Sequence, residues 1–370
     1  MDRLRTWIYV AGFALLAYPA VAVPTYTVTA IGTLGHSQVT GTGINASGQV
    51  TGFAGAEQGG GTRAFLFDGS TTQDLGTLGG NLSMGYGINA SGHVTGGSHT
   101  DTNLERAFVH NGTTMQDIGM PPGSFGGSYS QGRAINASGH VTGIALGGGG
   151  VSAFVYDGST MQDLGTFGGN QSSGLGINDS GQVTGFAALS GNTASHAFLF
   201  DGTTMHDLGT LGGANSEGRG INASGQVTGF AQYSSGPTDF HAFFYDGSTM
   251  HDLGTLGGSS SIGNSINDSG HVVGMSTHSG LGLHAFFHDG STMYDLNSLI
   301  APTDPLFGLI TLREATGIND SGQIVANSIN GAYLLTPVAE TEVPEPATLA
   351  LLAVGAIGVA TARRRSRAMA

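Results

Sequence analysis

The sequence predicts an all-β fold: a seven-bladed β-propeller made of four-stranded units and closed by a strand from the N-terminal part of the body. Three observations support this prediction. A set of phrases recurs with a period of about 45 residues. The composition, with 66 glycines in 370 residues and only 10% charged residues, suits short strands joined by tight turns. Finally, the last unit lacks one of these phrases, and a matching segment precedes the first unit.

Three phrases define the repeat. The first, INASGQV and its variants, begins at Ile44, Ile88, Ile135, Ile177, Ile221, Ile266 and Ile318. The second, AFLFDG and its variants, begins at Ala64, Ala107, Ala153, Ala197, Ala242, Ala285 and, as AYLL, Ala332. The third, DLGTLGG and its variants, begins at Asp74, Asp117, Asp163, Asp207, Asp252 and Asp295. Successive copies of the first phrase are 44, 47, 42, 44, 45 and 52 residues apart, which matches the length of a propeller blade.

Each unit contains two tight turns and therefore four strands. In INASGQV the asparagine side chain can bond the backbone two residues further on, and the glycine supplies the left-handed conformation that closes a bulged hairpin. The aspartate and glycine of FDGSTM provide the second reversal. We expect the strands GIN, QVTGF, AFLF and MHDLG, and a single unit could not bury its own apolar positions.

The two ends of the body complement each other. The last unit passes from AYLL directly into TPVAE without a third phrase, whereas Tyr26 to Gly35 (YTVTAIGTLG) matches a third phrase that has no unit of its own. A propeller uses such an overlap to complete its last blade and to remove two exposed sheet edges. The alternative is a β-solenoid with two coils of about 22 residues per period, which would need end caps that the sequence does not show.

The units resemble the extracellular HAF repeat. The HAF phrase stands at His196, His241 and His284, with the variants RAF at Arg63 and Arg106, SAF at Ser152 and GAY at Gly331. The resemblance covers the body from about Gly32 to Leu335. It implies an extracellular repeat protein with no known reaction, and no catalytic residues can be carried over from the family.

The body is strongly acidic. The chain has no lysine, and between Val23 and Ala339 five arginines stand against 21 acidic residues. A field of this sign repels phosphate backbones, so we expect no nucleic acid partner. Cysteine is absent, which excludes disulfides, thiolate metal sites and a cysteine nucleophile.

The N-terminal segment has the features of a secretion signal. Met1 to Arg5 is short and basic, Ile8 to Ala17 is apolar, and Ala20, Val21 and Ala22 form a small-residue cleavage site. Because the apolar stretch is too short to span a membrane comfortably, we expect a signal peptide at residues 1–22 rather than an anchor. The repeat body then occupies residues 23–339.

The C-terminal segment has three parts in order. A linker at residues 340–346 carries Val343, Pro344, Glu345 and Pro346; an apolar run at 347–362 is a predicted transmembrane helix; and a basic cytoplasmic tail at 363–370 opens with Arg363, Arg364 and Arg365. This order resembles the PEP-CTERM sorting signal of proteins that Gram-negative bacteria export alongside extracellular polysaccharide. The resemblance implies an exosortase-type membrane protease as partner, and a chain that is transiently anchored in the inner membrane before it reaches the cell surface or the extracellular space.

Two sets of repeating residues invite a chemical interpretation. The aspartates recur at turns in nearly every unit, whereas a catalytic pair occurs once in a chain, so we interpret them as turn residues. The 13 histidines fall at repeat-equivalent positions without an HxH or HxxxH spacing, which favours surface histidines over a metal site. The sequence therefore predicts no enzyme, no catalytic residue, no metal and no cofactor.

Residues that vary between units are stronger candidates for a binding site. The links between second and third strands differ in every unit, and a propeller would gather them on one face. That face offers a predicted ligand site of Asp101, Glu105, Tyr233, Asp239 and Phe240, a mixture suited to stacking on glycan and hydrogen bonding to it. The insert from Asn297 to Thr316 is expected to cover one end of the central channel.

These features predict a non-catalytic exported protein of the cell surface or the extracellular matrix, with a structural, adhesive or glycan-associated role and extracellular polysaccharide as a further partner. An extracellular glycan hydrolase or lyase with its site in the channel is the alternative. An ice-binding protein, suggested by the threonines, would need the flat array of a solenoid and is less favoured.

Overall fold

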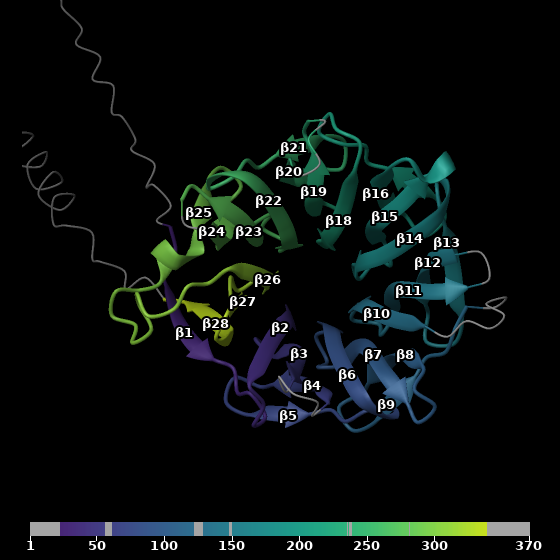
Figure 1. Ribbon diagram of the computed structural model, residues 1–370, viewed down its shortest axis with the longest axis horizontal. Helices are drawn as coiled ribbons and strands as arrows, with labels where there is room; N and C mark the ends of the chain where they lie inside the picture. Colours follow the sequence, from purple (N-terminus) through teal and green to yellow (C-terminus); the bar gives the residue numbers. More distant parts are fainter. Residues whose placement is uncertain are drawn as a thin grey trace, which may run out of the picture.

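The computed structural model describes residues 23–55, 61–121, 129–147, 150–234, 236, 239–280 and 282–338. Within them, short antiparallel strands form sheets that are arranged radially around a central channel, the architecture of a β-propeller (Figure 1). The predicted signal peptide, sorting motif, transmembrane segment and basic tail lie outside the described residues. Among the residues that are described, no helix is long and apolar enough to cross a membrane.

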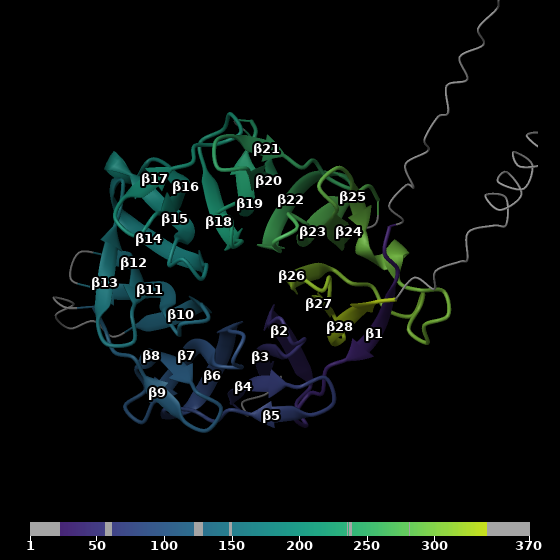
Figure 2. The same cartoon turned by 180° about the vertical axis from the view of Figure 1, so that it is seen from behind.

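Each repeat unit supplies strands at successive positions from the channel outward (Figure 2). The inner strands are β2 (Gln38–Ile44), β6 (Gly79–Ile88), β10 (Ser130–Ile135), β14 (Gly168–Ile177), β18 (Ser216–Ile221), β22 (Gly257–Ile266) and β26 (Glu314–Ile318). The second strands are β3 (Val50–Gly55), β7 (Val94–Thr100), β11 (Val141–Gly147), β15 (Val183–Leu189), β19 (Val227–Gln232), β23 (Val272–His278) and β27 (Ile324–Ser328).

The third strands are β4 (Thr62–Phe67), β8 (Glu105–His110), β12 (Gly150–Tyr156), β16 (Ser195–Phe200), β20 (Phe240–Tyr245), β24 (Gly282–His288) and β28 (Gly331–Pro337). The outer strands are β5 (Thr72–Asp74), β9 (Met115–Asp117), β13 (Met161–Gly165), β17 (Met205–Asp207), β21 (Met250–Asp252), β25 (Met293–Asp295) and β1 (Tyr26–Ala30). Two 3₁₀ turns, η1 (Ser190–Asn192) and η2 (Leu296–Leu299), complete the elements. Several inner strands are longer than the predicted GIN because they already begin at the glycine pair of the preceding DLGTLGG phrase.

Within the described residues the strands form five hydrogen-bonded sheets. Strands β2 to β9 and β10 to β17 make two eight-stranded sheets, because a parallel bridge joins neighbouring units at Thr62 with Leu82 and at Val151 with Gln171. Strands β18 to β21, β22 to β25, and β26 to β28 with β1 make four-stranded sheets.

The first strand completes the last sheet. Strand β1 pairs antiparallel with β28 in a register that sets Tyr26 opposite Pro337 and Ala30 opposite Tyr333. The predicted pairing of these segments is therefore confirmed, although the strand ends at Ala30 and the rest of the segment connects to the first unit. Because the last unit also contacts the first through Thr316 Oγ1, which donates to the Gly41 carbonyl at 2.9 Å, the units do not stack along a line and the solenoid alternative is wrong.

A belt of asparagine side chains joins the units at the end of the inner strands. Each Nδ2 donates to the backbone carbonyl of the equivalent asparagine in the next unit over 3.0 to 3.2 Å, and the last asparagine returns to the first. The members of this asparagine belt are Asn45, Asn89, Asn136, Asn178, Asn222, Asn267 and Asn319, all of them buried. The same side chains act within their own turns, as where Asn45 Oδ1 accepts hydrogen bonds from the backbone of Ser47 and Gln49.

Neighbouring sheets pack through a repeating set of small and aromatic residues. The phenylalanine of each AF phrase, such as Phe154 or Phe198, is completely buried, which stabilises the fold by about 1.5–3 kcal/mol per side chain. A buried serine bridges the units: Ser172 Oγ accepts from the Ala153 backbone and donates to the Gly165 carbonyl. Glycine is required where units meet, because a Cβ at Gly174 would lie 2.0 Å from Thr142 Oγ1.

The insert lies on the outer edge of the ring beside β1, not over the channel, so the expectation that it covers a channel end is wrong (Figure 1). Leu296, Leu299 and Leu312 pack into the core cluster that contains Tyr26. The insert also satisfies the free edge of β1, since Val28 N donates to Asp304 Oδ2 at 2.8 Å. It thereby protects the edge of the closing strand from pairing with another chain.

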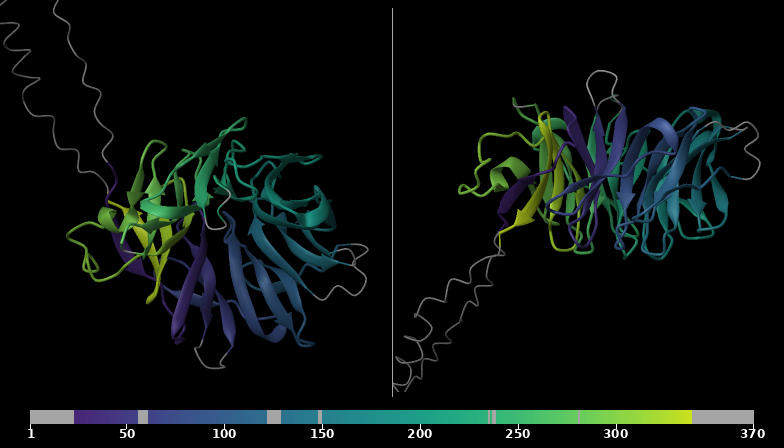
Figure 3. Two further views of the ribbon diagram at one scale, coloured as in Figure 1. Left: turned by 45° about the horizontal axis from the view of Figure 1, so that its top comes forward. Right: turned by 90° about the horizontal axis from the view of Figure 1, so that it is seen from below.

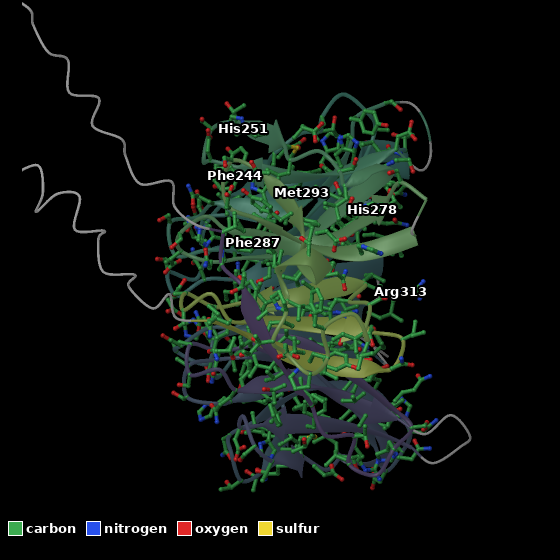
Figure 4. The ribbon with its side chains drawn as sticks, turned by 90° about the vertical axis from the view of Figure 1, so that its left-hand side faces the viewer. Phe244, His251, His278, Phe287, Met293 and Arg313 are labelled. Carbon is green, nitrogen blue, oxygen red and sulfur yellow. The ribbon has the colours of Figure 1, made fainter. Side chains whose placement is uncertain are left out.

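The ring has two unlike faces (Figure 3). The chain direction places the asparagine turns and the Asp-Gly turns on one face, here called the turn face, and the links between second and third strands on the other, the link face. Figure 4 shows this separation from the side, with Phe244 and His251 towards one face and His278 and Arg313 towards the other. The inner strands therefore start at the link face and end at the asparagine belt.

Removal of one asparagine from the belt should destabilise the whole ring. In Asn222→Ala the buried carbonyl of Asn267 loses its donor from the neighbouring unit and keeps only the Gly270 amide of its own turn, so we expect the free energy of unfolding to fall by about 1–3 kcal/mol. Urea unfolding followed by circular dichroism measures this change. The matched control is Asn111→Ala, because Asn111 caps an exposed turn in its own unit through Thr113 and Thr114 and should cost less. Equal losses in the two variants would contradict a special role for the belt.

Candidate functional site

The channel is narrow at the turn face. A cavity of about 240 Å³ there is lined only by the isoleucine and asparagine of each first phrase and by the residue after them. That following residue is Asp179, Asp268 or Asp320 in three units and alanine in the others. Each of these carboxylates accepts a backbone hydrogen bond from a preceding unit, as Asp320 does from Asp268 N at 2.8 Å. The residues that line the narrow end therefore repeat from unit to unit, and their hydrogen bonds join neighbouring units.

The channel is wider towards the link face, where the repeat breaks down. The residue two positions before each belt isoleucine lines this part of the channel and differs between units: Thr42, Tyr86, Arg133, Leu175, Arg219, Asn264 and Thr316. Because side chains alternate along a strand, the residue two positions earlier lies on the same face, and Ser173, Glu217 and Glu314 add a second tier to the wall. Each unit therefore presents its own side chains to one common space.

These side chains surround a cavity of about 590 Å³, which we call the channel mouth. Its lining combines the variable inner-strand residues with an apolar wall of Ile144, Val151, Leu175 and Phe186. Concave sites that mix apolar surface with a few placed polar groups are typical of ligand pockets, and the volume falls within their usual range.

One side of the channel mouth is a continuous polar network. Arg219 Nε donates to Glu217 Oε1 at 2.8 Å, and Arg219 Nη1 donates to Asn264 Oδ1 at 2.8 Å. Asn264 Nδ2 in turn donates to Glu314 Oε1 at 3.1 Å and to the Ala315 carbonyl. The guanidinium also lies 5.2 Å from the centre of the Phe230 ring. Both glutamates therefore act as hydrogen-bond acceptors for neighbouring side chains.

The other side is built around Arg133. Its guanidinium carbon lies 4.5 Å from the centre of the Tyr86 ring, a cation–π contact between neighbouring units. Burial raises the pKa of Tyr86, so this phenol stays protonated at neutral pH. Burial also raises the pKa of Tyr129 to about 12, with a further contribution from the negative charge of Glu105. That carboxylate accepts a hydrogen bond from Gln131 Nε2.

The charges at the channel mouth are unusual for this chain. Two of the five arginines of the body line the cavity, although the body as a whole is strongly acidic. The body has only four glutamates, and two of them, Glu217 and Glu314, line the cavity. A third, Glu105, accepts a hydrogen bond from Gln131, which lies two residues before Arg133. The aspartates, by contrast, occupy turns that repeat. Non-repeating charged side chains therefore converge here.

The structure disperses the five residues of the predicted ligand face. Glu105 accepts a hydrogen bond from Gln131, which lies two residues before the cavity residue Arg133. The ring of Phe240 makes an edge-to-face contact at 5.1 Å with Phe230, and Phe230 in turn contacts the cavity residue Arg219. Tyr233 is exposed and packs on the ring of His241 at 4.0 Å, while Asp239 accepts a hydrogen bond from Ser234 Oγ in its own loop. Asp101 is exposed in a turn. The role of these five residues in ligand binding stays a prediction.

Sequence reasoning missed the residues that line the channel mouth. A signal was present, because the position two residues before each belt isoleucine reads T, Y, R, L, R, N and T around an otherwise constant phrase. Each copy contributes one side chain, so the variation looks like ordinary drift until the units are placed in a ring.

The repeating aspartates act in turns, as expected. Asp68 Oδ1 accepts hydrogen bonds from the backbone of Ser70 and Thr71, and Asp157 accepts the equivalent bonds in its unit. The backbone donors Thr71 and Thr160 hold the pKa of Asp68 and Asp157 well below 3.8. The aspartate of the third phrase binds the glycine two residues on, as at Asp74 with Gly76.

The HAF histidines pair with the aspartates of their own units. His196, His241 and His284 bond through Nδ1 to Asp207, Asp252 and Asp295 at 2.7 to 2.9 Å. The expectation of surface histidines holds only in part, since His110, His284 and His288 are buried. Burial lowers the pKa of His110 and of His288, which favours their neutral forms. In the part of the chain that the structure describes, no three histidine or acidic side chains group as a metal site would require.

A protein-family model matches the C-terminal segment of the chain. Residues 342–365 match the PEP-CTERM protein-sorting motif. This chain is therefore exported and sorted, with a transient membrane-anchored stage before processing. The match covers the tail alone, so the HAF resemblance of the body stays a prediction. No curated protein matches the chain.

Solved structures match the body. A structure of YCF48 bound to a D1 peptide is 12% identical with a TM-score of 0.51, and the match covers 88% of this chain and 99% of that one. Acylaminoacyl peptidase from Pyrococcus horikoshii is 9% identical with a TM-score of 0.52, over 80% of this chain and 50% of that one. The β-propeller domain of the Trilobed protease from Pyrococcus furiosus is 10% identical with a TM-score of 0.49, over 73% and 83%. At such identities the likeness to the first two structures shows a shared fold alone.

The turn aspartates should make stability depend on acid pH. Because folding lowers their pKa, their contribution is present above the unfolded value of 3.8 and is lost as the pH falls towards the folded values. In Asp68→Asn with Asp157→Asn the free energy of unfolding should therefore fall less steeply below about pH 4 than in the parent protein, since an amide keeps the acceptor without ionising. Urea unfolding at pH 7 and pH 3 measures the difference.

The chain provides the reverse variant for the same experiment. Asn111 stands in the equivalent turn of the second unit and accepts the same bonds from Thr113 and Thr114. Asn111→Asp should steepen the loss of stability in acid. Identical pH dependence in all three proteins would contradict this explanation.

Proposed function

We propose that this protein is a non-catalytic, glycan-associated component of the cell surface or extracellular matrix, whose seven-bladed propeller binds saccharide at the channel mouth. The sevenfold asparagine belt and the pairing of β1 with β28 support the blade count. The sorting motif supports export and an exosortase-type partner. Within this proposal residues 1–22 are removed, residues 23–339 form the functional body, and residues 347–362 hold it in the membrane until processing.

The observation that carries the binding role is the convergence of non-repeating side chains at the channel mouth. Apolar and aromatic groups such as Tyr86, Leu175 and Phe186 can pack against the C–H faces of a sugar ring. The Ser173 hydroxyl can donate to and accept from sugar hydroxyls, and the Thr42 and Thr316 hydroxyls, which donate to backbone carbonyls, can accept. A structural role alone would not require five different residue types at the seven equivalent positions of the ring.

A hydrolase or lyase is the second candidate, because Glu217 and Glu314 both line the cavity. Glycoside hydrolysis needs one carboxyl that donates a proton and one that acts as base or nucleophile. Here Arg219 donates to Glu217 and Asn264 donates to Glu314, so both carboxyl groups are already engaged with neighbouring side chains. This arrangement favours binding over turnover.

A glycan array probed with the secreted body tests the proposal. We expect binding to a restricted set of extracellular polysaccharides, and Tyr86→Ala should weaken it at least about tenfold, equivalent to about 1.4 kcal/mol, because stacking inside the channel is lost. The matched control is Tyr233→Ala, which removes a tyrosine of the predicted link-face site outside the channel and should leave affinity unchanged.

The remaining outcomes decide between the candidates. Loss of binding in Tyr233→Ala but not in Tyr86→Ala would move the site to the outer loops, and binding to no glycan would overturn the association with polysaccharide. Release of reducing ends or unsaturated products from a bound glycan, abolished in Glu217→Gln or Glu314→Gln, would establish the enzyme instead.

A further inference from the structure

Two units carry the same arginine at the channel mouth but differ in its counter-ion. Glu217, Gly218 and Arg219 on β18 are structurally equivalent to Gln131, Gly132 and Arg133 on β10. Arg219 pairs with the glutamate two residues before it at 2.8 Å. At the equivalent position Arg133 has a glutamine, which carries no charge.

The structure gives Arg133 no replacement for the missing carboxylate. Among the described residues no acidic oxygen lies within 4.0 Å of its guanidinium, and Nε is buried without a hydrogen-bond acceptor. The nearby Glu105 is bound by Gln131 instead. The Oε1 atom of Gln131, a residue only 5% exposed, likewise has no hydrogen-bond partner among the described residues. A partly buried cation whose only described contact is the face of Tyr86 is incompletely compensated.

The surroundings restrict which charge can enter. At the turn face the channel ends among Asp179, Asp268 and Asp320, so an anionic ligand would approach from the link face. The strongly acidic body opposes densely charged anions such as phosphates, whereas one unpaired guanidinium matches the single carboxylate of one sugar residue. The apolar wall and the hydroxyls that line the same cavity suit a ring with C–H faces and hydroxyl groups.

We propose that Arg133, stacked on Tyr86, binds the carboxylate of an acidic sugar residue, so that the glycan supplies the counter-ion that Glu217 supplies to Arg219. The proposal rests on the proposed glycan-binding function and specifies its substrate class as a uronic-acid-containing saccharide. A carboxylate accepts two parallel hydrogen bonds from a guanidinium, which makes the contact directional as well as charge-assisted.

The test compares a tetramer of three xylose residues and one glucuronate, which carries a single carboxylate, with its methyl ester, which keeps the sugar rings and removes the charge. Isothermal titration calorimetry with the secreted protein at low ionic strength should show binding of the acid and at least about tenfold weaker binding of the ester. Arg133→Ala should reduce affinity for the acid to that for the ester. Arg63→Ala is the control, since this arginine lies near Asp74 outside the channel and should not change affinity.

A double variant that exchanges Glu105 and Gln131 separates the effect of the counter-ion on binding from any effect on folding. Glu105→Gln combined with Gln131→Glu preserves the side-chain hydrogen bond, the composition and Arg133, but moves the carboxylate to the position equivalent to Glu217. This variant should lose affinity for the acid as Arg133→Ala does, with unchanged circular dichroism and urea midpoint. Retained affinity for the acid in the exchange variant would overturn the proposal.

The outcomes also separate this proposal from the function on which it rests. Equal binding of acid and ester, abolished by Tyr86→Ala, would overturn the carboxylate contact and leave glycan binding intact. Binding of acetyl-triglycine through Arg133 without binding of either saccharide would overturn both, because the site would then recognise a peptide carboxylate. Absence of binding to the acid tetramer would also overturn this assignment.

Discussion

The side-chain amide of the asparagine that follows each inner strand is the interaction on which the rest of the molecule depends. Its Oδ1 accepts hydrogen bonds from the backbone of its own turn, and its Nδ2 donates to the carbonyl of the same residue in the next unit. One buried residue thus shapes the turn and fixes the distance to its neighbour. Each carbonyl also accepts the amide of the glycine three residues on, as Asn45 does from Gly48, but the asparagine side chains are buried, so an unmade belt bond leaves a buried Nδ2 without its acceptor and costs free energy.

This constraint separates structural residues from variable ones. The phenylalanines, the bridging serines and the contact glycines repeat because five junctions between units share the bond from the alanine of the AF phrase to a serine of the next unit. The belt holds only the ends of the inner strands, and the residue two positions before each isoleucine faces the channel, where Thr42, Asn264 and Thr316 also bond to a neighbouring unit. The polar network from Glu217 to Glu314 joins side chains from three units.

Sequence patterns predicted the features that form within a single unit. The period, both turns and the missing strand were readable because the turn residues and the third phrase act over a few positions, and the pairing of β1 with β28 followed from the same count. The channel mouth was not readable, since Tyr86, Arg133, Arg219 and Glu314 lie far apart in the chain and meet only once the ring is formed. The insert was misplaced for a related reason: its leucines pack on β1, a partner from the opposite end of the body.

Closure of the ring by β1 is the claim that one measurement tests most directly. Thr27 and Thr336 lie opposite each other across β1 and β28, and the chain has no natural cysteine. Thr27→Cys with Thr336→Cys should form an intramolecular disulfide under mild oxidation and leave no thiol to react, because facing residues of an antiparallel pair are close enough to bridge. Thr27→Cys with Thr160→Cys is the control and should keep its thiols. Free thiols in the first variant would contradict the ring and the channel that it encloses.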